Sequence, residues 1–265
     1  CGESAAAGLV LMTGFVAWEA RVDNPLLPLR LFRSRTFSIC SALGFMTGVA
    51  LFGGVVFLPL FFQVVTGVSA TNSGLLILPL TAGIVTGSIG SGRLTSRTGR
   101  YKVFPVAGSA LMAVGMYMLS YMDADTPNLV RAGSMGTLGL GVGMVMQVSI
   151  LAIQNVVEYR DLGIATSSAQ FFRSMGGSFG VAIFGVIMNA RLLVELPRQL
   201  SDEVVSAVSG DVTNLLSSPE AIRALPEDVA AGIAASLAVA IQEVFWWAAP
   251  IAATPVIAAE KAFMS

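Results

Sequence analysis

Long stretches without any charged residue are the feature that most constrains the fold of this chain. The 57 positions between Arg35 and Arg93 contain no Asp, Glu, Lys or Arg. Four further uncharged runs follow, at Val103–Met122, Ala132–Val157, Ser174–Ala190 and Val244–Ala259. A helix that crosses the hydrocarbon core of a bilayer needs about 20 apolar residues, and soluble domains rarely contain such runs. The chain is therefore predicted to be an all-α integral membrane protein with the lipid bilayer as its solvent.

Composition agrees with this prediction. Only 12% of the residues are charged, whereas roughly a quarter are charged in an average soluble protein. The 28 glycines fall inside the apolar runs as well as between them. Small residues let neighbouring helices approach closely in lipid. The apolar runs are therefore expected to form tightly packed helices.

Six complete membrane helices are predicted from the charge gaps. They cover residues 36–63, 73–91, 103–122, 132–155, 163–190 and 238–259. Residues 1–35 are interpreted as the end of a linker transmembrane helix followed by a cytoplasmic loop. The long polar stretch 191–237 is predicted to be an external loop, so that the six-helix domain covers residues 36–265.

The orientation prediction depends on the positions of the basic residues. Ten of the fifteen Lys and Arg residues fall in alternate connections that share one side: 19–35, 92–102, Arg160 and Lys261. Loops rich in Lys and Arg stay on the cytoplasmic side of a membrane. These loops are therefore predicted to be cytoplasmic, in a multi-pass protein of the cell (inner) membrane.

A weak internal repeat accompanies the helix pattern. The first predicted helix ends with Phe62-Gln63-Val64-Val65, and the fourth ends with Ile153-Gln154-Asn155-Val156-Val157. The first helix runs outward and the fourth inward, so two triplets of helices would have opposite topology. Inverted three-helix repeats are a common plan for transporters.

The connection between the second and third helices carries a motif. Gly92-Arg93-Leu94-Thr95-Ser96-Arg97-Thr98-Gly99-Arg100-Tyr101-Lys102 resembles the loop motif G-x-x-x-[DN]-R-x-G-R-[RK]-[RK] of the major facilitator superfamily. Its matching residues are Gly92, Arg97, Gly99, Arg100 and Lys102. In that family the loop forms part of a charge latch between the two halves of the transporter. Ser96 replaces the usual acidic residue, which implies a weaker latch.

Other stretches, in order, are similar to the fourteen-span drug–proton antiporter branch of this superfamily. They are Asn24–Arg33, Leu58–Gln63, Gly74–Pro79, Gln154–Val157 and Phe172–Gly180. The resemblance implies a six-helix carboxyl domain with a 3+3 inverted repeat. It also implies a proton-coupled multidrug exporter that works by alternating access. The partners would be protons, small apolar or cationic substrates, and an amino-terminal half that this fragment lacks.

Most candidate residues for the substrate cavity lie on the helices that line the cavity in the major facilitator fold. Arg173 is added because it is an isolated charge within a predicted membrane helix. The candidates are Phe45, Phe52, Gln63, Met144, Gln147, Gln154 and Arg173. Aromatic and Met side chains suit bulky, cationic molecules, and a buried amide requires a partner. For most of the aromatic and Met residues, plain packing or contact with lipid is the favoured interpretation.

Two charged residues leave alternatives open. Arg173 is the only charge within the fifth predicted helix, so it either faces the cavity or the interface between the two halves, or snorkels to the cytoplasmic surface. Glu243 either carries a proton or lies at the headgroup level beside Trp246 and Trp247.

Several classes of function are not expected. The chain has no His and only two Cys, so we expect no metal site and no cofactor. No polybasic block is present, which argues against nucleic acid as a partner, and no catalytic constellation indicates an enzyme. The alternatives are a superfamily transporter of another solute, such as a metabolite or siderophore, and a membrane anchor or assembly subunit.

Overall fold

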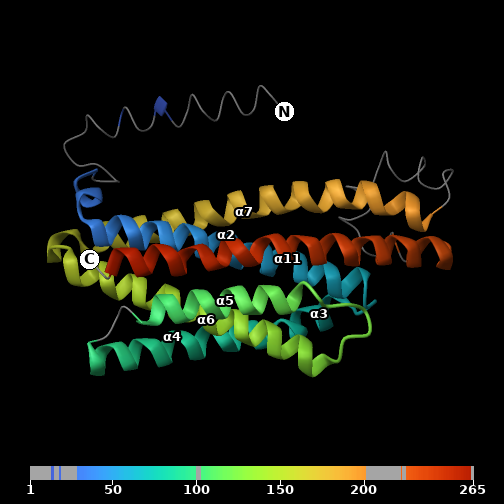
Figure 1. The fold of residues 1–265 in the computed structure, drawn as a ribbon, viewed down its shortest axis with the longest axis horizontal. Helices are drawn as coiled ribbons and strands as arrows, with labels where there is room; N and C mark the ends of the chain where they lie inside the picture. Colours follow the sequence, from blue (N-terminus) through green and yellow to red (C-terminus); the bar gives the residue numbers. More distant parts are fainter. Residues whose placement is uncertain are drawn as a thin grey trace.

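The computed structural model describes Thr13, Gly14, Trp18, residues 29–99, residues 103–200, Ile222 and residues 225–263. The described part of the chain is helical and contains no strand (Figure 1). Its elements, in chain order, are η1 (Leu29–Arg33), α2 (Arg35–Val64), α3 (Ala70–Leu76), α4 (Leu78–Thr98), α5 (Val103–Leu119), α6 (Asn128–Val156), η2 (Tyr159–Asp161), α7 (Leu162–Gln199) and α11 (Glu227–Phe263). The predicted linker helix within residues 1–35 lies largely outside the described residues.

The six long helices form two layers. One layer runs α4, α6, α2, α7, with each helix packed against the next. The other layer consists of α5 and α11, which pack against each other; α5 also contacts α6, and α11 contacts α2 and α7. Figure 1 looks onto the α5 and α11 side, with α7 and α4 at opposite edges. We call the exposed side of the four-helix layer, opposite α5 and α11, the front face.

Length and composition allow most of these helices to cross a bilayer. Five spans qualify among the described residues, with α3 and α4 counted together, and α5 is a shorter apolar helix of 17 residues. At 1.5 Å per residue, α5 is about 26 Å long, close to the thickness of the hydrocarbon core. The all-α membrane fold predicted from the charge gaps is therefore confirmed.

The connections gather at two ends of the bundle. At one end, Arg30 of η1 donates a hydrogen bond to Asp161 of η2 across 2.7 Å. At the other end, the linker after α2 and the linker after α5 line one shared depression, through Thr66 and Thr126 among others. Successive connections between the membrane helices lie alternately at one end and at the other, as the sequence predicted. We call the first the basic end and the second the distal end.

Glycine contacts reveal how the two triplets of helices correspond. A Cβ atom at Gly48 of α2 would overlap the backbone oxygen of Arg173 in α7. A Cβ atom at Gly139 of α6 would overlap the backbone oxygen of Leu80 in α4. Gly139 follows Gly48 by 91 positions, and Arg173 follows Leu80 by 93. The α2/α7 and α4/α6 interfaces are thus two versions of one packing arrangement.

Further contacts repeat with the same offsets. Two further pairs of the α4/α6 interface have counterparts in the α2/α7 interface: Gly83 on Gly136 matches Gly176 on Phe45, and Gly87 on Leu140 matches Gly180 on Val49. The repeat seen at Gln63 and Gln154 has the same 91-residue offset. The six helices therefore form a 3+3 inverted repeat, α2 to α5 and α6 to α11.

Several helix bounds differ from the predicted ones. The second predicted helix, 73–91, is two helices, because Pro79 opens α4 and the chain bends at Ile77. The predicted external loop 191–237 is wrong at both ends, since α7 continues to Gln199 and α11 begins at Glu227. The polar residues of these segments pair with one another and pack in helices, as described below.

Candidate functional site

A small cavity lies between α2, α6 and α7 and contains the guanidinium of Arg173. Its lining residues are Cys40, Gly44, Thr47, Val145, Met146, Ser149, Ile150, Ala169, Gln170 and Arg173. The volume is about 30 Å³, close to the space that one water molecule occupies in the liquid. The described lining residues all come from α2, α6 and α7, so the cavity belongs to the four-helix layer. We call it the Arg173 notch.

Arg173 has an unusual partner. Its Nη1 donates to the sulfur of Met146 on α6 at 3.0 Å, a weak acceptor. None of the ion pairs among the described residues includes Arg173. Its Cα lies about 17 Å along α7 from Leu162, which places the residue well inside a membrane helix. Ser149 also lines the notch, and its buried hydroxyl has no hydrogen-bond partner.

The predicted cavity residues do not converge on one site. Phe45 and Phe52 of α2 pack against α7, where the Phe45 ring lies 5.9 Å from that of Phe179 and Phe52 covers Gly177. Met144 of α6 faces α5 at Gly108. The helix assignment predicted for these residues is right, but their contacts are those of helix packing.

The three predicted glutamines occupy different places. Gln63 donates to the hydroxyl of Ser73 at 3.2 Å and ties the end of α2 to α3. Gln147 of α6 packs against Gly92 of α4. Gln154 is exposed in the last turn of α6 at the basic end. Of the predicted set, Arg173 alone lines the notch.

The loop motif begins within a helix. Gly92 and Arg97 belong to α4, which ends at Thr98, and Gly99 terminates it with a left-handed backbone at φ 66°. Glycine adopts this conformation without steric cost. The exposed Arg97 in the last turn complements the partial negative charge of the helix end. Arg100 and Lys102 lie outside the described residues, so their part in the predicted latch stays a prediction.

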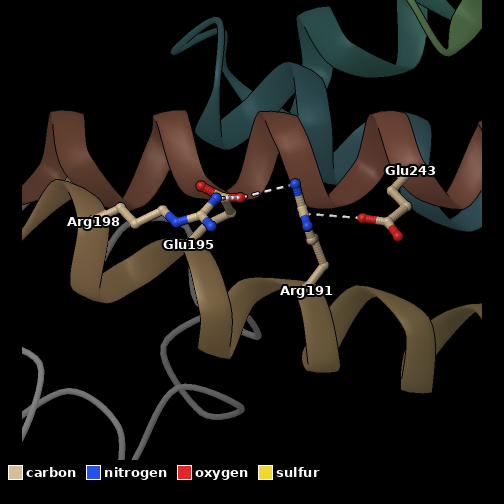
Figure 2. Close-up of polar contacts among 4 residues, drawn as sticks. All are labelled: Arg191, Glu195, Arg198 and Glu243. Atoms are coloured by element: carbon tan, nitrogen blue, oxygen red, sulfur yellow. Dashed lines mark hydrogen bonds and ion pairs between the residues drawn. The ribbon is translucent and has the colours of Figure 1, made fainter.

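A network of ion pairs joins α7 to α11 at the distal end. Arg191 contacts Glu195 through Nη2 and Glu243 through Nε, each at 2.9 Å, and Arg198 contacts Glu195 at 2.8 Å (Figure 2). The Glu195 side chain is only 8% exposed. Arg191, Glu195 and Arg198 lie within the predicted external loop 191–237. Their i, i+4 and i, i+3 spacing is the pattern that could have identified a helix.

Glu243 therefore has a structural partner. It lies one residue from Gln242, which donates to the backbone oxygen of Met122 in the linker after α5 at 2.8 Å. Trp246 and Trp247, one turn away, are about half exposed. These neighbours agree with a position at the edge of the bilayer. The alternative prediction of a proton carrier receives no separate support.

Comparison with protein families matches residues 5–181 to the Major Facilitator Superfamily. An uncharacterized MFS-type transporter of Mycobacterium tuberculosis is 41% identical over 90% of this chain and 34% of its own length. The multidrug transporter protein MdtP of Bacillus subtilis is 35% identical over 83% of this chain and 44% of its own length. A tetracycline resistance determinant of Streptomyces rimosus is 34% identical over 79% of this chain and 61% of its own length. The chain thus spans between about a third and three-fifths of these relatives.

A solved structure shares the fold. It is a bacterial homologue of the human lysosomal transporter Spinster, in an inward-facing and unoccupied conformation. The TM-score is 0.63 at 16% sequence identity, and the match covers 89% of this chain and 50% of that one. These similarities are consistent with the fourteen-span branch that the sequence motifs indicated.

Proposed function

The chain belongs to the Major Facilitator Superfamily, whose members are membrane transporters and not enzymes, and on this basis we propose that it forms the carboxyl half of a proton-coupled multidrug exporter. The similarity to MdtP and to a tetracycline resistance determinant supports the drug-export part of the proposal. The basic end would face the cytoplasm, as the distribution of Lys and Arg indicates.

The observation that carries the proposal is the front face. The edge helices α4 and α7 belong to the least buried of the five membrane spans. Only 22% and 28% of the 18-residue apolar segments of these two spans are buried inside the structure. Large apolar side chains stand out from both helices, including Val85, Ile89, Phe179, Ile183 and Val186. An apolar surface of this kind in a transporter half would be covered by the amino-terminal half, with the substrate path between the two.

The packing of the layer supports the alternating-access part of the proposal. The α2/α7 and α4/α6 interfaces bring glycine against backbone, which leaves no room for one helix to slide far past its neighbour. The carboxyl half would therefore move as one body. Rocking against the amino-terminal half would open the front face first to the basic end and then to the distal end. Protons would drive the cycle through carboxylates that lie mainly in the amino-terminal half.

Transport by the full-length protein tests the proposal. Everted membrane vesicles with an acidic lumen should accumulate a fluorescent apolar drug that has no basic group, because proton efflux through the transporter would drive drug entry; a drug without a basic group is not trapped passively by the acidic lumen. An uncoupler should abolish the accumulation. Accumulation that continues after the proton gradient has collapsed would contradict proton coupling. Failure to move any of a panel of apolar drugs would contradict the exporter assignment.

A further inference from the structure

Within the part of the chain that the structure describes, the Arg173 notch contains a positive charge without a negative partner. Its described lining residues include no Asp or Glu, and the hydrogen bond of the guanidinium goes to the weak sulfur acceptor of Met146. The ion-paired carboxylates among the described residues lie away from the notch: Glu158 and Asp161 at the basic end, Glu195 near the end of α7, and Glu243 midway along α11, where it pairs with Arg191 of α7. A cation inside a bilayer normally pairs with a negative group or contacts water.

A second group in the notch also lacks a partner. Ser149 is only 6% exposed, and its hydroxyl makes no hydrogen bond within the described structure. Most Ser and Thr hydroxyls in this bundle donate instead to a backbone oxygen of their own helix, as Thr47 does to Leu43. Buried polar groups are nearly always satisfied, so the Ser149 hydroxyl lacks a partner that it should have. Together with the half-buried Arg173 guanidinium, it offers hydrogen-bond donors to a ligand with acceptor oxygens.

The repeat shows that helix packing does not require this charge. The counterpart of Arg173 in the α4/α6 interface is Leu80, which is 1% exposed and packs against Gly139. Both residues present their backbone oxygen to the facing glycine in the same way. An apolar side chain therefore suffices at this position of the fold. The arginine is thus an addition that the packing of the layer does not explain.

We propose that the Arg173 notch binds the acidic group of the exported molecule, so that the transporter favours apolar substrates carrying a carboxylate or phenolate. The guanidinium would donate two hydrogen bonds to the anionic oxygens, and the Ser149 hydroxyl a third. This inference depends on the proposed function and specifies its substrate class. It replaces the cationic substrates expected from the aromatic residues, because Phe45 and Phe52 contact α7 instead of the notch.

The notch is far too small for a whole drug. Its volume of about 30 Å³ is close to that of one water molecule, so the anionic oxygens of the substrate would approach the notch while the apolar body lies beside it on the front face. A carboxylate contributed by the amino-terminal half is the competing occupant. It would neutralise Arg173 equally well, but it would not make binding depend on the charge of the substrate. That difference provides the test.

Two dyes with the same xanthene ring and opposite charge form the probe pair: fluorescein is anionic and rhodamine 123 is cationic. Fluorescence anisotropy would measure their binding to the purified full-length transporter and to Arg173→Gln. The substitution should weaken fluorescein binding about tenfold, the effect of losing a charged hydrogen bond, and leave rhodamine 123 binding unchanged or tighter. Arg198→Gln, at the distal end, serves as the control and should affect neither dye.

The opposite outcomes would overturn the proposal. These are a wild-type protein that does not bind fluorescein, or Arg173→Gln weakening both dyes equally or neither. Equal weakening is the result expected for a carboxylate partner from the amino-terminal half. If Arg173→Gln does not fold, Ser149→Ala and Arg173→Lys take its place, each with a smaller selective loss of fluorescein. Because binding is measured without a gradient, selective fluorescein binding without transport would contradict the proposed function alone.

Discussion

The α4/α6 and α2/α7 interfaces are two copies of one packing arrangement, and they differ in what fills the shared positions. At one position, Gly143 of α6 lies against the backbone of Ile84 in α4. In the α2/α7 interface, Phe52 stands in place of Gly143 and Gly177 in place of Ile84, so the small residue is on the other helix. At another position, Leu80 is replaced by Arg173. The comparison shows that inverted repeats preserve the backbone contacts that hold helices together, while side chains on the front face diverge.

The outer ends of the two triplets differ as well. In the second triplet, α7 and α11 pack against each other and carry the Arg191, Glu195 and Glu243 network. In the first triplet, no comparable packing joins α4 to α5. Gln242 of α11 lies level with the linker after α5, because it contacts Met122 there. The part of α11 that precedes Gln242 begins at Glu227 and extends about 22 Å beyond that level. The second triplet thus has an extension that the first lacks.

The largest expected effect is on the shared backbone contacts. Gly48→Ala and Gly139→Ala should each lower the free energy of unfolding by about 3 kcal/mol, because the added methyl group overlaps a backbone oxygen in both interfaces. Thermal melting of the purified protein in detergent measures the change. Gly90→Ala, where no atom lies within 4 Å of the new methyl group, is the matched control and should be neutral or slightly stabilising. Very unequal losses at Gly48 and Gly139 would break the equivalence of the interfaces.

A somewhat smaller effect is expected in the distal extension. Glu195→Gln removes the buried charge that Arg191 and Arg198 share, and should destabilise the protein by about 2 kcal/mol. Glu158→Gln, in an ion pair whose side chains are 69% and 70% exposed, should change stability by less than about 0.5 kcal/mol. Equal melting temperatures for the two variants would show that the network contributes nothing to the α7/α11 pair.

The exchange of large and small residues between the two interfaces predicts that an added methyl group costs less stability at Gly177 than at Gly143. Gly177→Ala should cost only about 1 kcal/mol, since the methyl group meets the movable ring of Phe52, whereas at Gly143 it meets the backbone of Ile84. Adding Phe52→Ala should recover most of the loss at Gly177. A double-mutant cycle on melting temperature measures this coupling. Additive effects would mean that the ring does not occupy the space above Gly177.

The smallest effect concerns the exposed linker after α5. The hydrogen bond from the Thr126 hydroxyl, 2.7 Å long, holds the pKa of Asp123 below its ordinary value. A depressed pKa stabilises the fold above the ordinary pKa, and this contribution is lost as the pH falls through the folded value. Thr126→Val should therefore raise the Asp123 pKa and make melting slightly less dependent on pH below about pH 4. An unchanged acid profile would contradict this role of Thr126.

The sequence predicted the helices well because the cost of charge in lipid controls where charged residues can lie. It could not predict which face of α2 or α6 points to a neighbour, since a helix surrounded by lipid and protein is apolar all round. Phe45, Phe52 and Met144 were therefore assigned to the right helices but do not line the notch. The distal ends of α7 and α11 were missed because composition alone does not separate a solvated loop from helices whose charges pair.

Accessibility of single cysteines in intact cells tests the central claim, an inverted repeat whose ends alternate across a bilayer. Cysteines at Asn72 and Asp125, both exposed at the distal end, should react with a membrane-impermeant maleimide added outside the cell. Cysteines at Ser96 and Glu158, exposed at the basic end, should react only after the membrane is permeabilised. Labelling of Asn72 and Ser96 from the same side would contradict the membrane topology and the transport mechanism built on it.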